Sequence, residues 1–179
     1  MRRPLKLHPD SRFTGVQIEV EATCPQAYCV KLSYLVTGDV SEIVLPSVMA
    51  SERKADLWQH TCFEAFVRAS GAEYYEFNFA PTTQWAAYRF SGHRAGKCLA
   101  EVNAPAIEVE RSHNRFGLRA FLQLPSLPGL SGEARWHLGL SAVIEDKSGN
   151  VSYWALAHPP GKPDFHHLDG FAYEVLPVG

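Results

Sequence analysis

The chain has 179 residues, the size of one domain, and 46% of them are hydrophobic and 20% charged, which is ordinary for a soluble globular protein. A formal net charge of −2, without a basic stripe, gives no reason to expect nucleic acid as a partner. No stretch approaches the roughly 20 apolar residues of a membrane helix, so we expect no membrane partner either.

The N-terminus carries two arginines but lacks the apolar segment of a secretory signal, so we expect a cytoplasmic protein. The cysteines Cys24, Cys29, Cys62 and Cys98 are then expected to be reduced thiols. Their spacing contains no CxxC pair, which argues against a zinc site built on them. Cys62 lies inside a strand-like run and is expected to be a packed thiol.

Short strand-like runs follow one another along the chain. After an extended arm at residues 1–14, strands are expected at 16–22, 27–36, 41–46, 61–67, 74–79, 85–90, 99–104, 106–112, 116–124, 134–145, 151–157 and 171–176. Segment 47–56 is predicted to be a helix or loop, and 91–97 and 158–170 to be loops. This pattern predicts an all-β fold, a single-domain antiparallel β-sandwich of jelly-roll-like type over residues 15–179.

The stretch 57–90 holds most of the polar side chains that can face a ligand. Large apolar side chains alternate along two of its predicted strands, which gives each strand one core-facing side. The core-facing sets are Thr61, Phe63, Ala65 and Val67, and Tyr75, Phe77 and Phe79. The opposite face then carries Cys62, Glu64 and Phe66 beside Tyr74, Glu76 and Asn78.

Tight turns at Ser70-Gly71 and at residues 81–83 make these strands antiparallel neighbours. A simple register places Glu64 beside Glu76 and Glu76 beside Arg89. That row is either a surface ion pair or the polar floor of a binding site. Two carboxylates also suit a glycosidase, but Arg89 is expected to keep both ionised, which does not suit an acid catalyst.

Three tryptophans are candidates for stacking against a flat ligand. Trp136 alternates with leucines and is expected in the core, whereas Trp58, Trp85 and Trp154 lie near predicted strand ends. Exposed indoles suit the apolar face of a sugar ring, and ordinary sandwich packing is the alternative. A continuous strand would separate Trp58 from Glu64 by roughly 20 Å. Both reach one small ligand only if Trp58 lies in a loop folded back over the sheet.

The loop 158–170 gathers His158, His166, His167 and Asp169. Imidazole and carboxylate groups bind zinc and other transition metals, so these four are candidate metal ligands. Histidines of a polar loop are otherwise solvated or hydrogen-bonded. No nucleophile elbow and no glycine-rich phosphate loop is present in the sequence.

The segments LWQHTCFEAFV, YYEFNFAPTTQWAAYRFSGHR and YWALAHPPGKPDFHH resemble the DOMON-like ligand-binding domains, which are related to carbohydrate-binding module family 9. The resemblance covers about residues 16–176 and implies a β-sandwich. In family 9 modules, two tryptophans sandwich a terminal sugar while a glutamate and an arginine bond its hydroxyls. Trp58 and Trp154 resemble the tryptophans, Glu64 the glutamate and Arg89 the arginine.

Related DOMON domains bind haem through methionine and histidine, and Met49 and His158 match that pair loosely. We expect a non-enzymatic domain without a cofactor, and a small, sugar-like molecule as its partner. The alternatives are a haem-binding module and a metal-dependent enzyme that uses the His158–Asp169 loop. The expected ligand-binding residues are Trp58, Glu64, Glu76, Asn78, Trp85, Arg89, Trp154 and His158.

Overall fold

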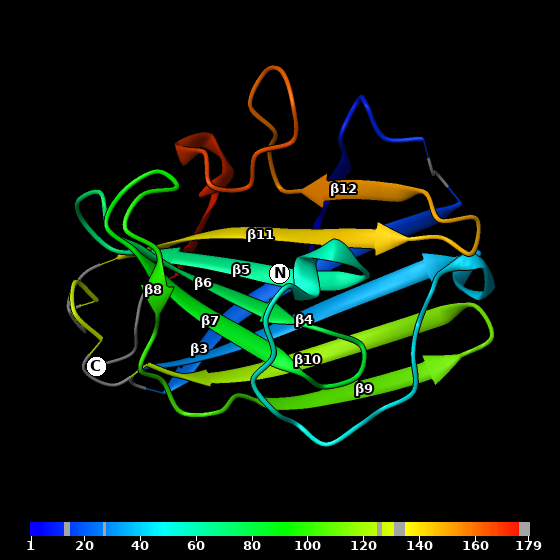
Figure 1. Ribbon diagram of the computed structural model, residues 1–179, viewed down its shortest axis with the longest axis horizontal. Coiled ribbons are helices and arrows are strands. Elements are labelled where there is room, and N and C mark those ends of the chain that lie inside the picture. Colours follow the sequence, from blue (N-terminus) through cyan, green and yellow to red (C-terminus); the bar gives the residue numbers. More distant parts are fainter. Residues whose placement is uncertain (13–14, 27, 125–126, 131–134, 176–179) are drawn as a thin grey trace.

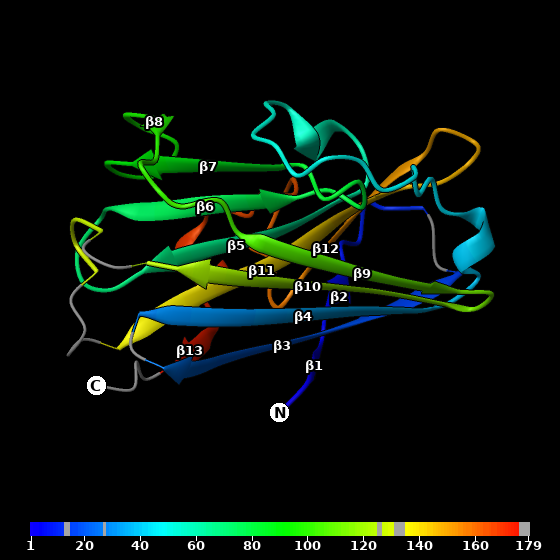
Figure 2. The same ribbon diagram turned by 90° about the horizontal axis from the view of Figure 1, so that it is seen from below.

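The computed structural model describes residues 1–12, 15–26, 28–124, 127–130 and 135–175, which form two antiparallel sheets stacked as a sandwich (Figures 1 and 2). The smaller sheet has the strand order β1-β3-β4-β10-β9. The larger sheet has the order β2-β12-β11-β5-β6-β7-β8, with β13 beside β11. The predicted all-β sandwich is confirmed, and the described residues contain no α-helix.

The strands differ widely in length. Those of the smaller sheet are β1 (Arg3–Pro4), β3 (Val16–Gln26), β4 (Cys29–Gly38), β9 (Ala106–Ser112) and β10 (Arg115–Gln123). Those of the larger sheet are β2 (Lys6–Leu7), β5 (Cys62–Arg68), β6 (Tyr74–Phe79), β7 (Trp85–Phe90), β8 (Cys98–Leu99), β11 (Trp136–Glu145), β12 (Val151–Ala155) and β13 (Tyr173–Val175). Three 3₁₀ turns complete the fold: η1 (Val40–Glu42), η2 (Leu57–Gln59) and η3 (Leu168–Gly170).

The main hydrophobic core lies between the sheets, where the alternating apolar residues of both inner faces meet. Trp136 is completely buried there, as the sequence predicts. The core-facing sides predicted for β5 and β6 are also confirmed: their members in this core are Phe63, Ala65, Val67, Tyr75, Phe77 and Phe79.

A second apolar cluster lies on the outer face of the larger sheet. It consists of Leu57, Cys62, Phe66, Tyr74, Ala80, Ala86, Tyr88, Phe90 and Phe171. Loops therefore cover much of this face, which explains why almost every residue of β5, β6 and β7 is buried on both sides. Much of the outer face of the larger sheet is therefore covered by packed side chains and is not exposed to solvent.

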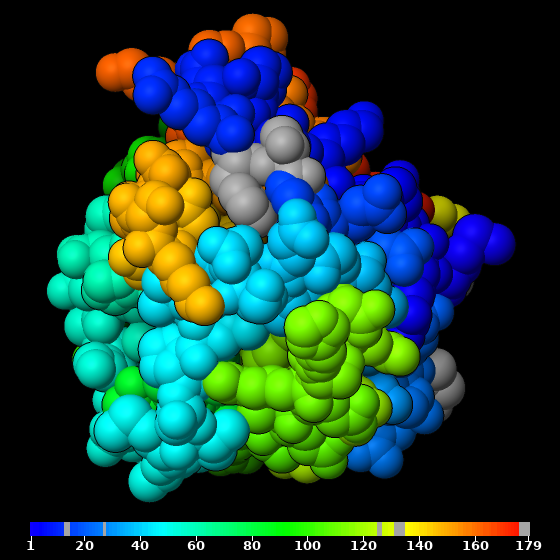
Figure 3. Space-filling model, turned by 90° about the vertical axis from the view of Figure 1, so that its right-hand side faces the viewer, coloured from blue at the N-terminus to red at the C-terminus, as the bar shows by residue number. Residues whose placement is uncertain are grey.

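Two predicted strands are largely absent because the chain crosses between sheets there. Segment 41–46 forms only one bridge, Ile43 with Asp146, as it passes from β4 to β5. Segment 99–104 pairs only at Leu99, on its way from β8 to β9 in the other sheet. At the end of the sandwich in Figure 3, the cyan segment after η1 lies beside the green β9–β10 turn and below the yellow-orange β11–β12 turn. Arg111 there bonds the carbonyl of Leu45.

The N-terminal arm is part of both sheets rather than a free extension. Its strand β1 pairs with β3, and β2 pairs with β12. Segment 47–56, for which helix and loop were both open, is a loop with one bridge from Arg53 to Trp85. Within the described residues, no helix is long and apolar enough to span a bilayer.

Candidate functional site

A pocket of about 480 Å³ opens on the outer face of the larger sheet, a size typical of small-molecule sites. Its floor comes from neighbouring strands and its walls from η2 and two loops, 91–97 and 156–167. The floor residues are Glu64, Glu76, Phe90, Val143 and Tyr153, and the wall residues are Trp58, Arg94, Lys97, Lys162, Pro163, Phe165 and His166.

Glu64 is the most deeply buried polar group of the floor, with 3% of its surface exposed. Among the described residues its carboxyl has one side-chain partner, the hydroxyl of Ser141, whose Oγ donates to Oε2 over a long 3.5 Å. A carboxylate can accept about four hydrogen bonds, so these residues leave most of its capacity unused. Burial, and next the charge of Glu76, raise the pKa of Glu64 well above its usual value.

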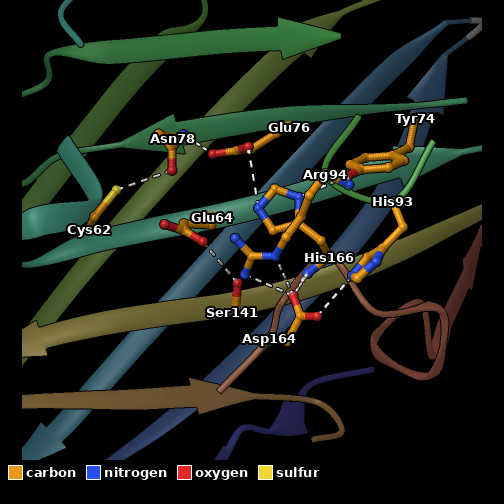
Figure 4. Close-up of polar contacts among 10 residues, drawn as sticks. All are labelled: Cys62, Glu64, Tyr74, Glu76, Asn78, His93, Arg94, Ser141, Asp164 and His166. Carbon is orange, nitrogen blue, oxygen red and sulfur yellow. Dashed lines mark hydrogen bonds and ion pairs between the residues drawn. The ribbon is translucent and has the colours of Figure 1, made fainter. Parts of the chain in front are cut away.

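Glu76 is oriented from behind by Asn78 (Figure 4). The Asn78 amide donates from Nδ2 to Oε1 of Glu76 over 2.6 Å, while its Oδ1 accepts from the Cys62 thiol at 3.6 Å. Burial raises the pKa of Glu76, and the hydrogen bond from Asn78 offsets part of that rise. Asn78 and Cys62 therefore fix the direction in which the second carboxyl faces the pocket.

The two wall loops are joined by Asp164. Its Oδ1 accepts from Nε and Nη2 of Arg94 at 3.1 and 2.9 Å and from the backbone amide of His166 at 3.1 Å. Its Oδ2 lies 2.8 Å from Nε2 of His93. Burial favours a raised pKa for Asp164, but the bonds from His93 and Arg94 outweigh it and lower that pKa. An ionised Asp164 thus holds Arg94 in the wall.

The contacts of His166 favour one tautomer. Its Nε2 faces Oε2 of Glu76 at 3.9 Å, and a carboxyl oxygen favours a proton on the nitrogen that faces it. Its Nδ1 lies 2.8 Å from the Tyr74 hydroxyl, which accepts from the backbone N–H of Arg94 at 3.1 Å and can donate its own proton to Nδ1. Burial, followed by the charge of Arg94, lowers the pKa of His166 to about 4. At neutral pH His166 is an uncharged donor beside the floor.

Aromatic side chains stand on two sides of the floor. The Trp58 indole is 47% exposed and belongs to η2, which precedes β5. This turn is tied to β11 by His60, whose Nδ1 lies 2.8 Å from Oε2 of Glu145. On the β12 side, the rings of Tyr153 and Phe165 pack edge to face with centroids 6.1 Å apart.

The structure brings together three of the predicted ligand-binding residues. Trp58, Glu64 and Glu76 line one pocket, because η2 folds Trp58 back over the sheet as the distance argument requires. Asn78 is 1% exposed and lies behind Glu76 rather than among the lining residues.

The predicted row of Glu64, Glu76 and Arg89 is wrong in register. Glu64 pairs with Asn78, which leaves Glu76 on the same face but diagonal to it. Arg89 pairs with Tyr75, on the face opposite to Glu76, and its guanidinium bonds Glu73 at 2.9 Å. The expectation that Arg89 keeps both floor carboxyls ionised is therefore wrong as well.

Three other predicted residues lie outside the pocket. Trp85 is 5% exposed and belongs to the main core, under the guanidinium of Arg53. Trp154 is also a core residue, and its Nε1 donates to Ser152. His158 uses Nε2 to bond the carbonyl of Lys6 in the N-terminal arm.

The residues proposed for metal and haem do not converge. His158 and His166 bond different elements, while His167 lies beside Asp169 with 3.6 Å between Nδ1 and Oδ2. Among the described residues, no group of three or more histidine, cysteine, aspartate or glutamate side chains is placed to hold a metal. Met49 is exposed on the 47–56 loop, and neither it nor His158 lines the pocket.

Several pocket residues escaped the sequence reasoning: Phe90, Arg94, Lys97, Val143, Tyr153, Lys162, Pro163 and Phe165. Two sequence features could have identified some of these residues. Alternation places Trp154 on the same face as Leu156, so Tyr153 points outward. Loop 91–97 is rich in basic residues, which is a second indication of a binding surface. The sequence contains no local feature that shows which loops cover the pocket floor.

Comparison with solved structures gives two relatives in fold. A candidate carbohydrate-binding protein from Bacteroides uniformis superposes with a TM-score of 0.69 at 13% identity, over 98% of this chain and 85% of that one. A family 9 carbohydrate-binding module from Caldicellulosiruptor kristjanssonii gives 0.56 in complex with glucose and 0.57 with cellotriose, both at 9% identity. These cover 96% of this chain and 83% and 80% of the module.

This chain has the fold of family 9 carbohydrate-binding modules. The predicted resemblance to family 9 is thus confirmed in architecture, and at these identities the similarity shows the fold alone. No protein-family model and no curated protein matches the sequence. Of the four residues to which the resemblance assigns roles, Trp58 and Glu64 line the pocket, whereas Arg89 and Trp154 lie elsewhere.

Proposed function

We propose that this chain is a non-catalytic sugar-binding domain whose ligand occupies the pocket beside Trp58. One observation carries the proposal: the half-exposed indole of Trp58 lines the same pocket as the buried carboxyl of Glu64, and the described residues use little of that carboxyl's hydrogen-bonding capacity. A sugar ring offers an apolar face for an indole and hydroxyl donors for such a carboxyl.

The geometry supports two further contacts. Glu76 presents a second carboxyl to the same space, and the neutral His166 adds an N–H donor beside it. Tyr153 and Phe165 supply apolar surface on the side formed by β12 and its following loop. The family 9 module of the same fold is solved with glucose and with cellotriose, which makes neutral glucose-type sugars the natural first probes.

A thermal-shift screen tests the proposal, followed by calorimetric titration of any hit. The panel contains glucose, galactose, cellobiose, cellotriose and glucuronate. A ligand at about 100 times its Kd stabilises the folded state by about 2.7 kcal/mol, which raises the Tm of a domain of this size by roughly 5–10 °C. At the same sugar concentration, Trp58→Ala should reduce the shift to about a third, because a Kd weakened roughly 30-fold lowers the stabilisation to about 0.9 kcal/mol. Met49→Ala, an exposed side chain outside the pocket, should leave it intact. A panel without any shift contradicts the proposal.

One observation favours a second candidate, glycoside hydrolysis. Burial raises the pKa of both Glu64 and Glu76, and a general acid needs a raised pKa. Incubation with aryl glycosides separates the two functions. A binding domain releases no phenol above the rate of the Glu64→Gln variant, whereas a hydrolase loses its release in that variant.

A further inference from the structure

Three cationic side chains line the same pocket: Arg94 and Lys97 in the loop after β7, and Lys162 in the loop after β12. Asp164 neutralises Arg94. Neither lysine has a carboxylate partner among the described residues. The Lys97 ammonium lies 3.8 Å from the centroid of the Tyr88 ring, which fixes its position over the strand next to Glu76.

Charge is distributed unevenly across the pocket. The carboxyls of Glu64 and Glu76 lie at the buried floor, whereas all three cations come from exposed loop positions at the rim. If both floor carboxyls are ionised, the three carboxyls, including Asp164, balance the three cations. A proton held by either floor carboxyl leaves the pocket net positive. A complementary ligand is therefore neutral and hydroxyl-rich at the floor and negative at the rim.

Two of the cations, Arg94 and Lys97, also come from the end of the sheet opposite to the stacking residue. Trp58 lies in η2, just before β5 begins at Cys62. At this end of the sheet, β5 pairs with the Phe79 end of β6. Loop 91–97 leaves the opposite end, after Phe90. In Figure 4 the Arg94 side chain reaches over the strands that carry Glu64 and Glu76. A ring on Trp58 with its hydroxyls on the floor thus directs its far end toward the cationic rim.

We propose that the ligand is an acidic sugar, a hexose unit bearing a carboxylate or phosphate group that Lys97 and Lys162 bind. This inference rests on the proposed sugar-binding function and narrows its ligand class. The lysine ammonium is a compact charge on a flexible side chain, so it can bind either a carboxylate or a phosphate without requiring one fixed geometry. Arg94 is fixed by two hydrogen bonds from its Nε and Nη2 to Asp164. Its Nη1 makes no hydrogen bond to the described residues and can therefore donate to the ligand.

Calorimetric titration with three matched sugars tests it: glucose, glucuronate and glucose 6-phosphate. In low salt an acidic sugar should bind at least about tenfold tighter than glucose, because its anionic group gains charge-assisted contacts with Lys97 and Lys162. About 1 M salt should shrink the ratio, because screening then acts within about 3 Å. Which of the two acids binds tighter identifies the anionic group.

A double variant locates the effect. Lys97→Gln with Lys162→Gln should bring the acid-to-glucose affinity ratio close to one. The matched control is Lys31→Gln with Lys147→Gln, two lysines outside the pocket, and it should keep the ratio. A preference for acids that survives in the first variant overturns the inference.

The outcomes also separate the two proposals. If glucose binds as tightly as both acids, the acidic-sugar inference is wrong and sugar binding stands. If none of the three sugars nor any neutral sugar of the panel binds, both proposals fall. If inorganic phosphate alone binds as tightly as glucose 6-phosphate, the ring contributes nothing, and sugar recognition is wrong.

Discussion

Replacing Glu64 by glutamine tests two effects of this carboxyl separately: its effect on the stability of the folded state and its effect on ligand affinity. Burial raises its pKa, so the folded state holds the proton to higher pH than the unfolded chain does. The free energy of unfolding therefore falls as pH rises from about 4.3, the ordinary pKa of glutamate, through the raised folded-state value. Glutamine does not ionise, so the variant should be more stable than the parent at pH 8 and should lose that advantage near pH 4.

The size of the gain follows from the contacts. Glu64 is 3% exposed, and within the part of the chain that the structure describes its carboxyl has only the Ser141 hydroxyl as a side-chain partner, 3.5 Å away. A buried polar group without adequate partners costs about 1–3 kcal/mol, and more when charged. A stabilisation of about 1–2 kcal/mol at pH 8 corresponds to a Tm rise of roughly 2–8 °C for a domain of this size. Sugar affinity should fall about 10- to 100-fold, because a charge-assisted acceptor is lost.

Thermal unfolding of parent and variant between pH 4 and pH 8 measures the difference. Glu108→Gln is the control, because Glu108 lies on the exposed face of β9 beside Arg119 and should leave Tm unchanged at both ends of the range. If Glu64→Gln lowers Tm at pH 8, or changes it equally at every pH, the carboxyl has a structural partner and the reasoning is refuted.

Other measurements test further parts of the site. Trp58→Ala should weaken sugar binding by about 2 kcal/mol or more, roughly 30-fold in Kd, with little change in Tm, whereas Trp136→Ala should cost about 3–5 kcal/mol of stability as a core truncation. An equal loss of Tm in both variants would make Trp58 a packing residue. NMR titration of His166 should give a midpoint near 4 with Nδ1 unprotonated at neutral pH; an ordinary midpoint near 6.5 contradicts its burial. In native protein a thiol reagent should label exposed Cys98 quickly and buried Cys62 only after unfolding; fast labelling of both contradicts the packing of β5.

The architecture was predictable because its causes are local. In the run from Tyr74 to Phe79, alternation assigns each side chain to one of two faces without knowledge of the partner strand. The turn residues between β5, β6 and β7 make antiparallel neighbours of these strands. Glu64 and Glu76 were thus correctly placed on one outward face, and Trp136 in the core.

Register was not predictable, because it depends on how many residues each turn consumes. A shift of two residues between β5 and β6 moves Glu76 from beside Glu64 to the diagonal position but keeps its face. A shift of one residue between β6 and β7 carries Arg89 to the other face, away from the pocket. One residue is enough because the side-chain period of a strand is two.

The walls of the pocket were decided by tertiary structure alone. Arg94 and Asp164 are 70 residues apart in sequence, and their contact exists only because two loops meet over the larger sheet. Alternation in the sequence fixes which side chains leave the sheet on its outer face. Whether such a side chain meets water, a cation or an indole depends on long-range packing of loops, which no local pattern encodes.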